Sequence, residues 1–258
     1  KYYGLLFGGG LLLSTYILKG IYKRENLKDN AHEALFIYGI IGIFVGARLG
    51  HCLFYDFEYY SKNILEMFLP IKINQIGEIK FIGYSGLASH GGTIGLIISL
   101  FLYSKKYEIK YLKILDLIAI VAPLGATFIR LANLMNSEMI GNPTTMPWAF
   151  IFRKVDNLPR HPAQLYEAIV YFIIFIIIFT VYKTKNIKLG NGFMFGLAIT
   201  LIFTMRILIE YVKVNQVEFE EGMKLNMGQI LSIPFIIIGI YFMGKNLIKK
   251  ETKQKTSP

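Results

Sequence analysis

Residues 168–182 read AIVYFIIFIIIFTVY, and residues 231–244 read LSIPFIIIGIYFMG. Neither stretch contains a charged side chain, and such long apolar runs are typical of helices that cross a bilayer. The whole chain agrees with them. Its 258 residues are 54% hydrophobic and only 17% charged, and the mean hydropathy is +0.47. We therefore predict an all-α polytopic membrane protein, with residues 1–258 forming a single integral membrane domain.

About seven transmembrane helices are expected from the apolar stretches bounded by charge. They lie at 3–18, 34–55, 86–104, 114–134, 162–182, 190–212 and 227–244. The connections at 19–33, 105–113, 183–189 and 245–258 hold sixteen of the 28 Lys and Arg residues. The positive-inside rule then places the N-terminus outside and the C-terminus in the cytoplasm. Topology thus explains the net charge of +11, and no nucleic-acid partner is needed.

The longer connections are expected outside the membrane. Residues 56–85 are predicted to form an extracytoplasmic arm, and residues 135–161 an extracytoplasmic head rich in proline turns. Residues 245–258 are expected to be a basic cytoplasmic tail. The single Cys52 excludes an internal disulfide framework. No cleavable signal is expected, and because the chain begins at Lys1 rather than Met, we expect residues to precede it.

Ionisable residues inside spans are costly, so each calls for a reason. In the predicted topology, six polar side chains fall in the outer third of the membrane: Arg48, Arg130 and Arg206 in outward-going spans, and Tyr3, His90 and His161 in inward-going ones. Single arginines could instead snorkel to headgroups, and Arg206 with Glu210 could be a structural i,i+4 pair. His51 and Cys52 are interpreted as packing residues, and Asn133 and Asn136 could cap or order a loop. Three arginines at one level nevertheless favour a site.

The residue types at this level indicate a chemistry. Guanidinium groups match phosphate in geometry and permanent charge, and a neutral imidazole can accept a proton near pH 7. The sequence has neither a clustered Asp/Glu motif for magnesium nor a His/Cys spacing for zinc. We therefore predict a metal-free site without a cofactor, with arginine for an anionic lipid headgroup and histidine as a candidate base.

Several motifs along the chain resemble those of one known family. The most specific are RLANLMNSEMIG at 130–141 and RHPAQLYEA at 160–168, together with SHGG at 89–92. Further agreement comes from Tyr3-Gly4, GARLG at 46–50, RILIE at 206–210 and MGQILSIP at 227–234. Together these motifs resemble those of the prolipoprotein diacylglyceryl transferases. They cover nearly the whole chain in the family's order, although Ser137 stands where the family usually has glycine.

The resemblance implies a function and roles for residues. Family members transfer the diacylglyceryl group of phosphatidylglycerol to the lipobox cysteine thiol of a preprolipoprotein, in the bacterial inner membrane, and release glycerol phosphate. The site would face the outer leaflet. His90 would help remove the thiol proton, and Arg130 and Arg206 would neutralise the leaving phosphate. The matching positions implied to bind substrate are Tyr3, Arg48, Asn133, Glu138, Gly141, His161 and Glu210.

Two other functions are open from the residues alone. Residues 83–86 read GYSG, the short pattern of an intramembrane serine protease, and Ser85 would need His51 or His161 beside it. A lipid flippase or transporter would be expected to carry polar groups near the midplane, whereas here they gather at one leaflet. Ser85→Ala should abolish only proteolysis, and Arg130→Ala should abolish the transferase.

Overall fold

The computed structural model describes residues 2–28, 30–73, 78–81, 83, 86–184, 189–214, 223 and 225–255, without the side chains of residues 73 and 246–255. It divides into two compact units. The first unit combines Lys1–Glu25 with Leu112–Pro258, and the second is Asn26–Tyr111. Ser85, which belongs to the protease alternative, lies outside the described residues.

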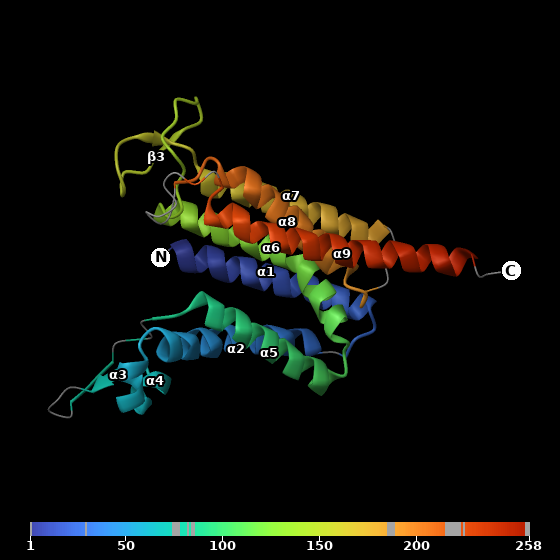
Figure 1. Cartoon of the computed structure of the whole chain (residues 1–258), viewed down its shortest axis with the longest axis horizontal. Coiled ribbons are helices and arrows are strands. Elements are labelled where there is room, and N and C mark those ends of the chain that lie inside the picture. The colour runs from blue at the N-terminus through green and yellow to red at the C-terminus, as the bar shows by residue number, and fades with distance from the viewer. Residues whose placement is uncertain are drawn as a thin grey trace. The chain divides into compact units, whose positions relative to one another are not determined.

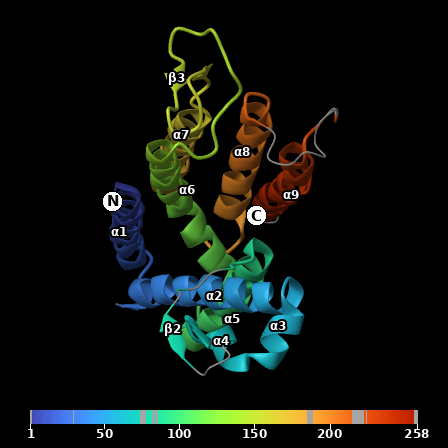
Figure 2. The same ribbon diagram turned by 90° about the vertical axis from the view of Figure 1, so that its left-hand side faces the viewer.

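Five long helices build the first unit: α1 (Tyr2–Arg24), α6 (Tyr111–Asn136), α7 (Ala163–Thr184), α8 (Phe193–Glu210) and α9 (Met227–Lys255). Helix α8 packs against both α7 and α9 (Figures 1 and 2). The α8–α9 contact is close because glycines face each other. A Cβ on Gly196 would lie 2.6 Å from the Gly239 carbonyl oxygen, so any side chain there would force the helices apart.

Polar side chains fix the ends of these helices. Asp116 of α6 is 1% exposed, and its carboxylate accepts hydrogen bonds from the backbone N–H groups of Gly190, Gly192 and Phe195 at 2.8–3.0 Å. It thereby satisfies the free donors at the start of α8. Helix α9 begins with a capping box, in which Asn226 and Gln229 each accept from the other's backbone N–H.

A small head connects α6 to α7 (Figure 1). It contains the antiparallel pair β3 (Phe150–Ile151) and β4 (Pro159–Arg160). Isolated bridges join Pro143 to Arg160 and Gly141 to Lys213. The segment around Gly141 therefore lies between the start of α7 and the residues that follow α8, and it ties three parts of the chain together.

The second unit is organised by α2 (Ala31–Phe54) and α5 (Ser89–Tyr107). Gly42, Gly46 and Gly50 of α2 are spaced by four residues and meet Gly91 and Gly95 of α5 backbone to backbone. This small-residue stripe allows the helices to approach closely. Between them, the chain forms α3 (Phe57–Lys62), α4 (Ile64–Phe68) and the antiparallel pair β1 (Ile71–Ile73) and β2 (Ile79–Phe81).

The prediction of an all-α polytopic membrane protein is confirmed, with the two short strand pairs as local additions. Within the described residues, six helices are long and apolar enough to cross a membrane: α1, α2, α6, α7, α8 and α9. The seventh expected span forms α5, which has 19 residues but is not among the six. The reason is its composition, since glycine, serine and histidine fill its first turns and Lys105 and Lys106 its last.

Candidate functional site

The structure distributes the predicted site residues over both units. Arg48 and His90 belong to the second unit. The first unit holds the other eight, namely Tyr3, Arg130, Asn133, Glu138, Gly141, His161, Arg206 and Glu210. Most of these eight lie where α6 ends, α7 begins and α8 ends, so the site is built outward from that junction.

A buried network of charges connects the three helix ends. Arg130 Nε lies 3.0 Å from Glu167 Oε2, at ion-pair distance but without the alignment of a hydrogen bond. Lys213 Nζ lies 3.1 Å from Glu167 Oε1 and 3.4 Å from Glu210 Oε2. The Glu167 side chain is 1% exposed and that of Lys213 5%. Since an unpaired buried charge costs several kcal/mol, each member depends on its neighbours.

Arg206 of α8 lies near this network and makes no ion pair within the described residues. Arg130 and Arg206 both lie near enough to the buried Tyr171 of α7 to act on it electrostatically. Within the described chain, the Nε atom of Arg206 is buried and has no hydrogen-bond partner. The group thus contains three cations (Arg130, Arg206, Lys213) against two carboxylates (Glu167, Glu210).

The alternative of an Arg206–Glu210 ion pair is wrong for the described residues. Glu210 pairs with Lys213 instead, and its carboxylate packs against Gly228, where a Cβ would lie 2.6 Å from Oε1. The end of α8 turns at Tyr211 and places Lys213 beside Glu210, three positions along the chain. The i,i+4 spacing indicated a possible pair, but a partner three residues beyond Glu210 takes its place.

A cluster of hydrogen-bonded polar side chains lies at the end of α6 and consists of Asn133, Asn136 and Glu138. The Asn133 amide donates to Glu138 Oε2 at 2.7 Å, and the Asn136 amide donates to Oε1 at 3.1 Å. Gln164 at the start of α7 is fully buried and donates to the Glu138 backbone carbonyl. The interpretation of Asn133 and Asn136 as residues that order a loop is therefore consistent with their contacts, and Glu138 is the centre of that order.

Gly141 has a steric role. A Cβ at this position would lie 2.6 Å from both Cβ and the carbonyl oxygen of His161, and 2.7 Å from the Val212 carbonyl oxygen. Its backbone N–H donates to the His161 carbonyl at 3.0 Å. Only glycine fits at this crossing of three backbone segments.

His161 is held by a relay of hydrogen bonds in the head. The indole N–H of Trp148 donates to the Tyr166 hydroxyl at 2.8 Å, and this hydroxyl lies 3.1 Å from His161 Nδ1. Because an indole N–H can only donate, the Tyr166 oxygen is the acceptor of that bond and its own proton is free to go to His161. In this arrangement, Nδ1 accepts and the neutral ring carries its proton on Nε2.

Arg160 orders the rest of the head. Its guanidinium donates to both carboxylate oxygens of Asp156 at 2.5–3.1 Å, and to the Gly141 carbonyl at 3.2 Å. The hydrogen bond from Arg160 lowers the pKa of the Asp156 carboxyl below its ordinary value, and Asp156 raises the pKa of Arg160.

Arg48 is occupied within its own unit. Its guanidinium donates to the backbone carbonyls of Glu66 at 2.6 Å and Met67 at 3.1 Å, and it lies 4.7 Å from the ring centroid of Tyr60. Glu66 is buried and accepts a hydrogen bond from the Tyr59 hydroxyl, which raises the pKa of Tyr59 to about 12. Through these contacts, Arg48 fastens α4 of the arm to α2.

His90 and Tyr3 have open surroundings within their units. His90 is exposed in the first turn of α5, and Tyr3 is half-buried at the start of α1, where its ring stacks on Phe7. His51 and Cys52 pack as expected, since His51 contacts the rings of Tyr55 and Tyr60 and Cys52 is fully buried.

Sequence reasoning missed several residues that build the site. Glu167 is a carboxylate at the start of the most apolar span, and its cost in the membrane was a signal that could have identified it. Lys213 stands just beyond a span and gave no such signal. In the described part of the chain, no three His, Cys, Asp or Glu side chains gather as metal ligands would.

Comparison with known proteins identifies the family of this chain. A model of the family described as "Prolipoprotein diacylglyceryl transferase" matches residues 1–244. The chain belongs to this family. It is a prolipoprotein diacylglyceryl transferase family member and hence a transferase, and the family carries out the first step of lipoprotein maturation.

Individual family members cover nearly the whole chain. A phosphatidylglycerol–prolipoprotein diacylglyceryl transferase of Bacteroides fragilis is 55% identical over 243 residues, which are 94% of this chain and 88% of the relative. The transferase of Tolumonas auensis is 43% identical, with 94% and 89% covered. That of Porphyromonas gingivalis is 41% identical, with 99% and 92% covered. The recognition made from motifs is therefore confirmed.

Proposed function

We propose that this transferase moves the diacylglyceryl group of phosphatidylglycerol to the thiol of the lipobox cysteine in a preprolipoprotein. A carbon–sulfur bond forms at the glycerol carbon, and the carbon–oxygen bond to the phosphate breaks. The products are a thioether and glycerol phosphate, and the thiol proton leaves with a base. Relatives that cover this chain almost fully are named for phosphatidylglycerol and prolipoprotein.

The observation that carries the proposal is the cation in excess. Arg130, Arg206 and Lys213 face only two carboxylates in the described charge group, and the buried Nε of Arg206 lacks a partner. A phosphate beside the three cations would supply the missing negative charge. As the carbon–oxygen bond breaks, charge grows on the phosphate, so fixed donors stabilise the transition state more than the ground state.

Lys213 and Glu167 hold Arg130 in position. The Glu167 carboxylate holds Arg130 on one oxygen and Lys213 on the other. Arg130 is thus oriented but incompletely neutralised, since its carboxylate partner is shared. We assign Arg130 and Arg206 to the phosphate, and Glu167, Glu210 and Lys213 to positioning.

His161 and His90 receive different roles. With Nδ1 accepting from Tyr166, His161 presents an Nε2–H donor, which suits a phosphate or glycerol oxygen rather than a thiol proton. His90 is exposed in the first turn of α5, and an imidazole can serve as a general base, so we propose His90 for that role. If His90→Gln kept wild-type turnover from pH 6 to 9, the role of base would pass to another group.

The membrane placement is part of the proposal. The excess of lysine at one set of connections supports an N-terminus outside and a C-terminus in the cytoplasm of a bacterial inner membrane. The charge group then lies toward the outer leaflet, with the arm and the head on the extracytoplasmic side.

A mass measurement tests the reaction. Purified protein in detergent is incubated with phosphatidylglycerol and a synthetic lipobox peptide, and the mass of the peptide is measured by mass spectrometry. We expect a gain of one diacylglyceryl group with the wild type, no gain with a Cys→Ser peptide, and a loss of at least a hundredfold in rate for Arg206→Gln. Arg153→Gln removes an exposed charge of the head and serves as the matched control, with unchanged rate.

Other outcomes separate the alternatives. Cleavage of the peptide without a mass gain would favour a protease, and movement of labelled lipid without modification would favour a flippase. If Arg206→Gln and Arg153→Gln reacted equally fast, the assignment of the phosphate to the charge group would be wrong.

A further inference from the structure

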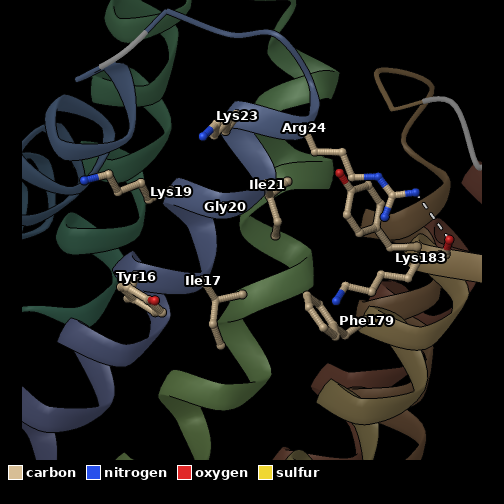
Figure 3. Close-up of a pocket in the computed structure, with 10 residues that line it drawn as sticks. Tyr16, Ile17, Lys19, Gly20, Ile21, Lys23, Arg24, Phe179 and Lys183 are labelled. Atoms are coloured by element: carbon tan, nitrogen blue, oxygen red, sulfur yellow. Dashed lines mark hydrogen bonds between the residues drawn. The ribbon is translucent and has the colours of Figure 1, made fainter.

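A cavity of the first unit lies far from the charge group. It measures about 460 Å³ and is lined by residues near the ends of α1 and α7 (Figure 3). The head lies at the other end of α7 (Figure 1). From Glu167 to Lys183, sixteen residues of α7 rise by about 24 Å. The cavity therefore lies at the opposite end of the helices from the proposed reaction site.

Its polar rim is cationic. Lys19, Lys23, Arg24 and Lys183 line the cavity, and no described residue of the lining is acidic. Glu25 is close in sequence, but its carboxylate lies 2.9 Å from Lys113 Nζ and accepts a hydrogen bond from the Tyr182 hydroxyl at 3.2 Å. The neighbouring carboxylate is thus already engaged with a different lysine.

Aromatic rings hold two of these cations in place. Arg24 lies 5.0 Å from the ring centroid of Tyr182 and donates to the Lys183 carbonyl at 3.3 Å. Lys183 Nζ lies 4.7 Å from the ring centroid of Phe179. Figure 3 shows Arg24 and Lys183 close together, joined by that hydrogen bond. Both side chains are exposed and keep further N–H donors for an anion.

The rest of the lining is apolar. Ile17 and Ile21 of α1 and Phe179 of α7 form much of it. Gly20 leaves it open, because a Cβ at this position would meet no atom within 4 Å. A cationic rim above apolar walls matches an amphiphile with an anionic head, whereas a free phosphate ion would gain nothing from the walls.

We propose that this cavity binds an anionic glycerophospholipid, with its phosphate between Arg24 and Lys183 and its first acyl carbons along Ile17, Ile21 and Phe179. In the proposed topology, the ends of α1 and α7 lie at the cytoplasmic surface, so the lipid comes from the leaflet opposite the reaction. Basic pockets at that surface bind anionic headgroups by charge and are strengthened by aromatic residues at the interface.

Native mass spectrometry of the purified protein tests the site by counting retained lipids, with dioleoyl phosphatidylglycerol and dioleoyl phosphatidylcholine as probes. Removing both charges in Arg24→Gln/Lys183→Gln should weaken one phosphatidylglycerol site about thirtyfold. Gly20→Leu should prevent lipid binding at the same site, because the leucine side chain would occupy the cavity. Lys105→Gln/Lys106→Gln removes two charges outside the cavity as the matched control and should retain the wild-type number of lipids.

The reaction provides a second readout, because neither cavity variant touches the charge group. Diacylglyceryl transfer should continue in both, while Arg206→Gln should lose transfer and keep the cavity lipid. The proposal fails if the cavity variants hold as much phosphatidylglycerol as the wild type, or if phosphatidylcholine is retained equally. Displacement by millimolar inorganic phosphate would also overturn it, since the site would then bind a free anion and not a lipid.

Discussion

At the scale of single residues, the site depends on side chains that share partners. Glu167 offers one carboxylate oxygen to Arg130 and the other to Lys213, and Lys213 also reaches Glu210. No pair in this group is independent, so removing one member leaves its neighbours buried without compensation.

Lys213→Met should therefore lower both stability and activity. The buried carboxylates of Glu167 and Glu210 lose their shared cation, a cost of about 3–5 kcal/mol for a broken buried pair. Thermal unfolding in detergent measures it. Lys213→Met/Glu210→Gln should recover part of the loss, because one uncompensated charge is removed with the lysine. Two purely additive losses would show that the residues are not coupled.

Ser137 indicates a site of strain. Its φ of +61° lies in the left-handed region, which a side chain disfavours by about 1–2 kcal/mol. Ser137→Gly should raise the free energy of unfolding by up to about 1 kcal/mol, observed as a higher Tm. Ser61→Gly is the contrasting variant, because Ser61 lies within α3 and glycine should destabilise it there. An unchanged or lower Tm for Ser137→Gly would show that the serine is not strained.

At the scale of elements, small residues decide which helices pair. The α2–α5 contact uses a glycine face on α2, and the α8–α9 contact uses Gly196 and Gly239. Glycines within spans favour close helix packing, but a glycine pattern does not identify the partner helices, because any apolar helix could accept such a face.

Two glycines of α2 provide a matched test. A Cβ on Gly46 would clash with the Gly91 carbonyl oxygen and lie 2.7 Å from the Gly95 Cα, whereas a Cβ on Gly39 meets only Leu96 at 4.0 Å. Gly46→Ala should destabilise the protein by about 1–3 kcal/mol, and Gly39→Ala should be neutral or stabilising. Tm values in one detergent compare them. Equal effects would show that the α2–α5 backbone contact is absent.

The head should loosen in acid. Arg160 lowers the pKa of Asp156, so this pair contributes stability above the unfolded pKa of about 3.9 and loses it as the pH falls through the lower folded value. Trp148 is the single tryptophan and lies in the head, so its emission reports the change. The wild type should show a transition below the unfolded pKa of about 3.9 that Asp156→Asn lacks. An identical transition in both proteins would assign it to another carboxyl.

At the scale of the whole molecule, the proposed topology places the two proposed lipid sites at opposite leaflets. The described spans provide the helices, and the distribution of lysine provides the orientation. The orientation thus rests on the distribution of lysine, and it is a prediction with a direct test.

Single cysteines can measure that orientation. In a Cys52→Ser background, Lys154→Cys places a thiol in the head and Lys105→Cys places one at the end of α5. A membrane-impermeant maleimide should label only residue 154 in intact spheroplasts, and both positions after lysis. Labelling of residue 105 alone before lysis would invert the topology and move the charge group to the inner leaflet.

The fold class and the family could be read from the sequence, because long apolar runs and long ordered motifs are local properties of a chain. Tertiary structure decided the rest. Glu167 and Lys213 became site residues only when α7 and the segment after α8 met, and Arg48 proved to hold the arm through backbone carbonyls that no pattern reveals. The physical reason is that the role of a buried charged side chain depends on the groups it contacts. When those groups are distant in sequence, only the packing of the helices brings them together.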